Sequence, residues 1–116
     1  MSENEQRVSL EPIKHIRVHR DGQLVAETAR GYVVHEKGLS DRFYIPRADI
    51  RATLTDGTTD GHCPWKGEWK HLDVQISDVL KVPDGAWTYY APTPVCEAIR
   101  DFVAFYDSKF QIDHIR

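Results

Sequence analysis

The sequence predicts a mainly β protein, a single compact antiparallel domain of roughly seven to nine short strands with one α-helix near the C-terminus. Apolar and polar residues alternate in several short runs, a pattern typical of half-buried strands. Turns rich in glycine and aspartate separate these runs. Only near the C-terminus do apolar residues recur at every third or fourth position, as on one face of a helix. A chain of 116 residues is long enough to bury one core without disulfides or metals.

The N-terminal third contains the clearest strand signals. Residues 1–11 lack periodicity and are expected to form a flexible arm, which leaves residues 12–116 as the β-rich domain. Residues 14–20 and 23–28 alternate on either side of Asp21-Gly22, so they predict a β-hairpin.

Four further strands are predicted in the middle of the chain. Residues 31–35 and 42–45 predict the third and fourth strands, and Pro46 stops the fourth. Residues 50–54 predict a fifth strand, and residues 72–77 alternate with their apolar side chains inward.

Two polar segments are predicted to be turns, and the helix follows them. Residues 55–61 and 83–85 combine aspartate with glycine or proline, which is turn chemistry. Residues 86–90 predict another strand, Pro94 fits the first helical position, and residues 110–115 predict a last short strand. The apolar face of the expected helix comprises Val95, Ile99, Phe102, Val103 and Tyr106.

Composition narrows the classes of partner. A net charge of −3 and an isoelectric point near 6.0 argue against binding to nucleic acid or to an anionic membrane. No apolar run approaches the roughly 20 residues of a membrane helix, and the acidic first six residues do not resemble a signal peptide. We therefore expect a cytoplasmic protein with two reduced cysteines and a small molecule or peptide as its partner.

The segment 62–69 concentrates more reactive side chains than any other stretch. It reads His-Cys-Pro-Trp-Lys-Gly-Glu-Trp and so places a thiol, an ammonium, a carboxylate, an imidazole and two indoles within eight residues. Pro64 and Gly67 predict a loop or a strand edge here. The segment indicates where a site lies, without specifying its chemistry.

Cys63 and Lys66 are the candidate catalytic residues. Lys66 and His62 would lower the pKa of the Cys63 thiol and favour the nucleophilic thiolate. Glu68, His62 and Asp49 are the side chains available to orient or deprotonate it. The alternative is that Cys63 is a small buried apolar residue and Lys66 a solvated loop lysine or a ligand for an anion.

No metal and no cofactor are expected. A zinc site needs about four converging ligands, and the only local cluster, His62, Cys63 and His71, has the spacing of no standard site.

Four segments resemble one known family. Residues 43–50, 63–67, 86–89 and 103–106 occur in the order found in domain-of-unknown-function family 427 of bacteria and fungi, which also carries a nucleotidyltransferase label. The resemblance covers residues 16–112 and implies a fold similar to the β-tent group, which includes methionine sulfoxide reductase B and cereblon-like ligand-binding domains.

Two departures limit what the resemblance implies. The zinc of many β-tent relatives is held by two Cys-x-x-Cys pairs, which this chain lacks, and Glu68-Trp69 replaces the small residue and tyrosine typical after Gly67. Nucleotidyl transfer is not supported, because neither a phosphate-binding glycine loop nor paired acidic residues for Mg²⁺ are present.

The leading hypothesis is a binding domain for a small polar or anionic ligand or a peptide, in an aromatic cleft beside the 63–67 loop. The expected cleft residues are Tyr44, Asp49, Cys63, Lys66, Trp87 and Tyr89. One alternative is a cysteine-dependent enzyme or redox protein using Cys63, which requires a base within hydrogen-bond reach. The other is an interaction module using Trp65 and Trp69, which requires a flat exposed patch.

Overall fold

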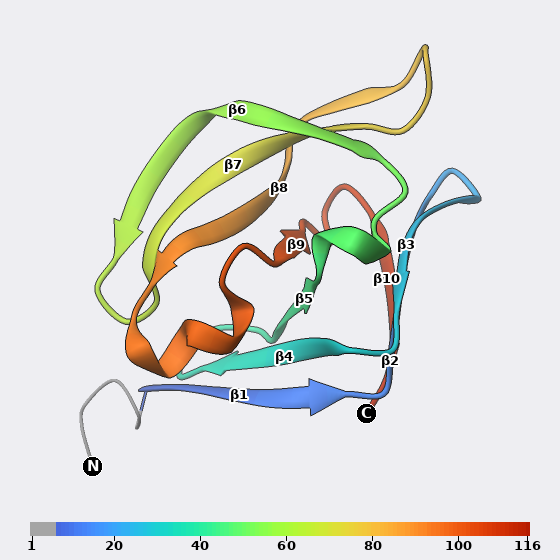
Figure 1. The fold of residues 1–116 in the computed structure, drawn as a ribbon. Helices are drawn as coiled ribbons and strands as arrows, with labels where there is room; N and C mark the ends of the chain where they lie inside the picture. Colours follow the sequence, from blue (N-terminus) through green and yellow to red (C-terminus); the bar gives the residue numbers. More distant parts are fainter. Residues whose placement is uncertain (1–6) are drawn as a thin grey trace.

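Two antiparallel sheets make up the part of the chain that the computed structural model describes, residues 7–116 (Figure 1). The seven strands of the larger sheet are, in spatial order, β1 (Val8–Ile13), β4 (Gly31–Glu36), β5 (Arg42–Ile45), β9 (Val103–Phe105), β8 (Lys81–Pro92), β7 (Gly67–Gln75) and β6 (Thr53–Cys63). The smaller sheet comprises β10 (Gln111–Ile115), β2 (His15–Arg20) and β3 (Gln23–Thr28). Two 3₁₀ helices, η1 (Arg47–Asp49) and η2 (Pro94–Ile99), complete these elements. The prediction of a mainly β, antiparallel protein is confirmed.

The strands with strong local signals form where the sequence predicts them. Asp21 and Gly22 have φ values of 51° and 77°, so both adopt the left-handed conformation that the tight hairpin between β2 and β3 requires. Strands β4, β5 and β10 also lie within a residue of the predicted bounds. These elements are specified by alternation and turn chemistry within a few residues of each other.

The expected flexible arm is wrong for residues 8–11, because they belong to β1. This strand pairs along its whole length with β4, and its end residues Val8 and Ile13 are 1% and 3% exposed. The order comes from pairing with a distant strand, for which the local sequence gives no periodic signal. The rest of the expected arm, residues 1–6, lies outside the described residues.

The turns expected at 55–61 and 83–85 are strand irregularities, so both predictions are corrected. Residues 53–63 run as one long edge strand, β6, whose pairing with β7 shifts between Asp56 and Asp60. Asp84, with φ of 49°, lies within β8 where its register with β7 shifts. Glycine and aspartate are tolerated in bulged strands, so these residues did not end the strands. Ile50, expected to begin a strand, makes an isolated bridge to Ala26.

The expected C-terminal α-helix is also corrected. A 3₁₀ helix begins at Pro94, as predicted for the helix start, but it ends at Ile99. Asp101 then takes φ of 62°, and its backbone N–H donates to the Tyr89 carbonyl at 3.0 Å. The chain continues as β9, between β5 and β8. The apolar residues expected to form one helical face therefore lie in or next to two different elements, η2 and β9, and their helical spacing is a coincidence.

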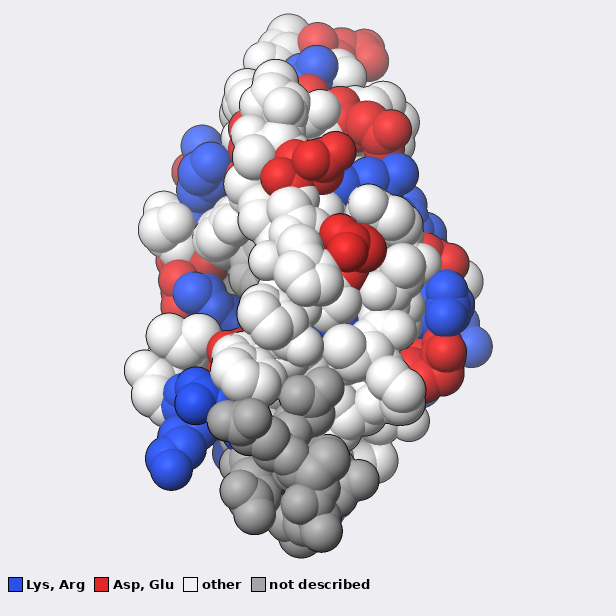
Figure 2. Space-filling view, turned by 90° about the vertical axis from the view of Figure 1, so that its left-hand side faces the viewer, with Lys and Arg blue, Asp and Glu red and all other residues white. Residues whose placement is uncertain are grey.

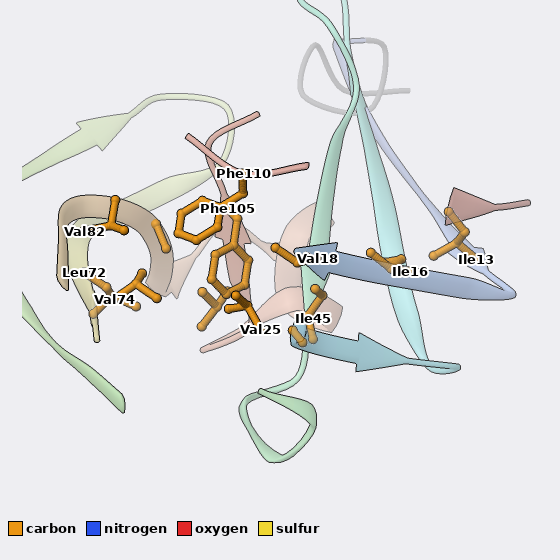
Figure 3. Packing of buried hydrophobic residues seen from close by; sticks show 13 residues of the cluster. Ile13, Ile16, Val18, Val25, Ile45, Leu72, Val74, Val82, Phe105 and Phe110 are labelled. Carbon is orange, nitrogen blue, oxygen red and sulfur yellow. The ribbon is translucent and has the colours of Figure 1, made fainter. Parts of the chain in front are cut away.

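One hydrophobic core lies between the two sheets (Figure 3). Large-sheet side chains such as Ile45, Leu72 and Phe105 pack there against Val18 and Val25 of the smaller sheet. This cluster covers one face of the large sheet.

A second core, richer in aromatic residues, covers the other face of the large sheet. Side chains alternate along each strand, so Ala86 faces the first core while Trp87 faces the second. The second core contains Val8, Val34, Tyr44, Trp87, Tyr89, Ala104 and, from η2, Cys96 and Ile99. In Figure 1, β6–β8 arch over this side while β1 and β4 lie opposite them. No helix in the described residues is long and apolar enough to cross a membrane.

Candidate functional site

A cavity of about 190 Å³ opens beside the second core, and four aromatic side chains wall it. Trp69 and Tyr89 are directly opposite each other on β7 and β8, so both project from the same face of the sheet. Trp87 belongs to the same face, and its ring lies 4.5 Å from that of Tyr106. Strand pairing therefore brings together aromatic residues that are far apart in the sequence.

Hydrogen bonds fix the aromatic walls from behind. The Trp87 indole Nε1–H donates to the Tyr44 hydroxyl at 3.0 Å, and Tyr44 has no exposed surface. The Tyr106 hydroxyl lies 2.8 Å from His71 Nε2. Burial raises the pKa of Tyr44 and of Tyr89 above the ordinary value, so both remain neutral phenols.

A buried ion pair lies in the wall of the cavity. The Lys66 ammonium is 2.5 Å from Glu36 Oε1, and each side chain is only 11% exposed. Apart from this ion pair, Glu36 Oε1 is a buried acceptor with no hydrogen-bond partner in the described part of the chain. The ammonium also lies 5.5 Å from the centre of the Tyr89 ring. Lys66 and Glu36 both line the cavity.

Backbone contacts direct Lys66 inward. Its N–H donates to the Cys63 carbonyl at 3.2 Å, and its carbonyl accepts from the Thr93 N–H at 3.0 Å. Gly67 follows with φ of 117°, and a Cβ there would lie 2.6 Å from Pro92 Cα. Only glycine fits this close approach. The 62–69 segment therefore ends β6, turns tightly at residues 64–66 and begins β7, and the turn is attached to the chain just before η2.

Arg42 supplies the third charge of the cavity lining. Its guanidinium carbon lies 5.4 Å from the centre of the Trp87 ring. Its recorded ionic partner is Asp107, at 3.6 Å, and the Asp107 side chain is 68% exposed. The remaining lining residues are Val34, Leu39 and Ser40, the last two from the loop between β4 and β5.

An imidazole between two carboxylates ties down that loop. His35 Nδ1 lies 2.8 Å from Asp41 Oδ1, and its Nε2 lies 3.1 Å from Glu11 Oε1. The hydrogen bond to Asp41, and then that to Glu11, raises the pKa of His35. Arg116 also pairs with Asp41. The loop at the cavity mouth is thereby held to β1 and to the C-terminal end of the chain.

A model of the family described as a domain of unknown function (DUF427) matches residues 9–115. The chain belongs to the DUF427 family. A search among curated proteins gave no match.

The DUF427 structure brings three of the six expected cleft residues into the cavity lining, namely Lys66, Trp87 and Tyr89. Tyr44 lies behind the wall, bonded to Trp87. Asp49 lies elsewhere, on η1, where it accepts hydrogen bonds from Thr28 at 2.7 Å and from Arg30 at 3.0 Å. These bonds, the one from Arg30 first, lower the pKa of Asp49.

Cys63 lies beside the cavity, at the end of β6. It is partly buried against the second core. His62 projects to the opposite face of the strand, is 61% exposed and lies 2.7 Å from Glu68. Of the three side chains expected to orient or deprotonate Cys63, His62 and Glu68 thus pair with each other. Cys96 is fully buried, and burial raises the pKa of its thiol to about 11.

Sequence reasoning missed Glu36, Arg42 and Tyr106, and it did not place Trp69 in the cleft. For the first two, the alternation of side chains along a strand gave a signal, because residues two positions apart point to the same face. Glu36 is two residues beyond buried Val34, and Arg42 is two residues before buried Tyr44. A charged residue that continues a buried face is a candidate site residue. For Tyr106, which follows a strand that was expected to be helix, no comparable signal existed.

No metal cluster marks the described part of this DUF427 domain, and the face shown in Figure 2 carries no broad basic patch. No three His, Cys, Asp or Glu side chains of residues 7–116 gather as metal ligands would. On the face in Figure 2, basic and acidic atoms are interspersed around a largely uncharged centre, outside the grey region. The cavity is therefore the most developed candidate site.

Proposed function

We propose that this DUF427 domain binds a small polar or anionic molecule in the aromatic cavity beside the Cys63–Gly67 turn. The observation that carries the proposal is the Lys66–Glu36 ion pair, buried in the wall of a cavity that four aromatic side chains also line. Burying two charges is costly and adds little net stability, so such a pair is better explained by a binding role than by folding. A few polar groups in an aromatic hollow are typical of ligand sites.

The size of the cavity sets the scale of the ligand. Its volume of about 190 Å³ is below the range of roughly 300–1,000 Å³ that is usual for drug-sized ligands. A small metabolite fits this space, and so does one side chain of a peptide. A fold of the β-tent type, which the sequence resemblance implies, would support the proposal by analogy alone, since some members of that group bind ligands.

The positions of three residues favour binding over the alternatives. An enzyme based on Cys63 would need a base directed at the thiol, whereas His62 faces outward toward Glu68. An interaction module would need a flat exposed indole patch, whereas Trp65 and Trp69 are both partly buried.

A fragment screen monitored by ¹H–¹⁵N NMR tests the proposal. Hits are expected to shift the amide signals of the residues that line the cavity. Trp69→Leu, which removes one wall, should weaken binding at least tenfold. Trp65→Leu is the matched control, because this partly buried indole lies four residues away in the β6–β7 turn and is not part of the cavity lining. Hits that bind both variants equally, or shifts confined to distant residues, would refute the proposal.

A further inference from the structure

We infer that the ligand is a small planar carboxylate, held at its anionic end by Arg42 and at a second polar atom by Lys66. This inference rests on the proposed binding function and specifies its ligand class. It depends on the charges, the stacking geometry and the volume of the cavity.

Arg42 is the uncompensated cation of the cavity lining. Of the three charged lining residues, Lys66 and Glu36 neutralise each other, which leaves the charge of Arg42. Its contact with Asp107, at 3.6 Å, is longer than a hydrogen bond, and the exposed carboxylate is screened by water. A ligand carboxylate can displace so weak a partner.

The position of Arg42 leaves its donors available. The Arg42 guanidinium lies over Trp87, with its carbon 5.4 Å from the ring centre, and the N–H groups of a guanidinium lie in its own plane. That arrangement suits two parallel hydrogen bonds to a carboxylate. A cationic ligand is disfavoured, because the chain's own cations already lie over Trp87 and Tyr89.

Lys66 provides a second point of attachment. The ammonium has three N–H donors, and Glu36 is the acceptor group recorded near it in the described residues. Because the side chain is 11% exposed and lines the cavity, its other donors are available to an acceptor on a ligand bound there. A hydroxyl or carbonyl oxygen opposite the carboxylate can serve as this acceptor.

The walls and the volume select a flat, compact ligand. Aromatic side chains stack on planar rings, and Trp69 and Tyr106 supply such surfaces. About 190 Å³ has no room for a nucleotide, and a single uncompensated cation does not match a polyphosphate. The simplest molecule with all these features is 4-hydroxybenzoate.

The test compares 4-hydroxybenzoate with its uncharged isostere 4-hydroxybenzamide, by NMR titration or calorimetry on the full chain. The carboxylate should bind about ten- to a hundredfold more tightly, as charge-assisted bonds do. Arg42→Gln should abolish this preference, and Asp107→Asn should raise affinity for the carboxylate severalfold. Arg20→Gln is the control, because Arg20 also lies over a ring, Phe110 at 5.9 Å, away from the cavity.

Each contrary result is informative. Equal binding of the two probes would overturn the carboxylate inference and leave the proposed binding function intact. Failure of both probes at millimolar concentration, or preference for inorganic phosphate, would also overturn it. The fragment screen decides the proposed function separately.

Discussion

Breaking the buried ion pair should destabilise the protein far more than breaking an exposed one. Lys66→Met leaves Glu36 as an uncompensated charge in a site where each side chain is 11% exposed. Losing one partner of a buried pair costs about 3–5 kcal/mol, and the residual exposure favours the lower end. With a urea m-value of about 2 kcal/mol/M, the midpoint should fall by roughly 1.5–2 M. Tryptophan fluorescence during urea unfolding measures the midpoint.

A double-mutant cycle separates the pair from its surroundings. Lys66→Met combined with Glu36→Leu should recover most of the loss, because no unpaired charge remains, and stability should return to within about 1 kcal/mol of the wild type. The control is Lys70→Met, which breaks the exposed pair with Asp56 at 3.0 Å and should cost at most about 1 kcal/mol. If Lys66→Met costs no more than Lys70→Met, or the double variant loses the sum of both single losses, the reasoning fails.

Three further outcomes are expected. The raised pKa of His35 means that its bonds stabilise the fold below the ordinary pKa of 6.5, and that this stabilisation disappears as pH rises through the raised value. Urea midpoints of the wild type, measured between pH 5 and 9, should therefore fall as the pH rises. If the midpoint of His35→Gln falls with pH as steeply as that of the wild type, the prediction is contradicted. Tyr44→Phe should cost about 1–3 kcal/mol in urea unfolding, since it leaves the buried Trp87 N–H unpaired; a loss below about 0.5 kcal/mol would refute that role. A thiol reagent, followed by mass spectrometry, should alkylate Cys63 in the native protein and Cys96 only after unfolding; equal rates would contradict the burial difference.

The sequence predicted those parts of the fold that local chemistry specifies. The Asp21-Gly22 hairpin is correct because two positive φ values and alternating flanks occur within one short segment. By contrast, β1 and β9 are ordered by strands that are not local in the sequence: Val8 pairs with Glu36, and Ala104 pairs with Tyr44. For β9, helical spacing outweighed strand signals because only three residues pair, and nothing local indicates that both of its neighbours are strands.

The candidate site was predicted in part for the same physical reason. Lys66 was identified because reactive side chains crowd its own segment, and Trp87 because aromatic residues recur around it. Glu36 and Arg42 come from the consecutive strands β4 and β5, whereas aromatic walls such as Trp69 and Trp87 come from β7 and β8. Only the pairing of distant strands reveals that these residues share a cavity. Asp49 was expected in the cleft but lies on η1, because the charge of a side chain does not determine its position in the fold.

The three-residue strand β9 has a consequence for how the protein acquires its shape during synthesis. It is the sole link in the described sheet between the half built from β1, β4 and β5 and the half built from β8, β7 and β6. Residues 103–105 are synthesised after the other six strands of this sheet, so β9 cannot join the two halves until all of those strands have been made. Such late, non-local pairing slows folding. The newly made halves therefore expose open strand edges for longer than a protein with sequential pairing would, and during that interval they depend on protection from aggregation.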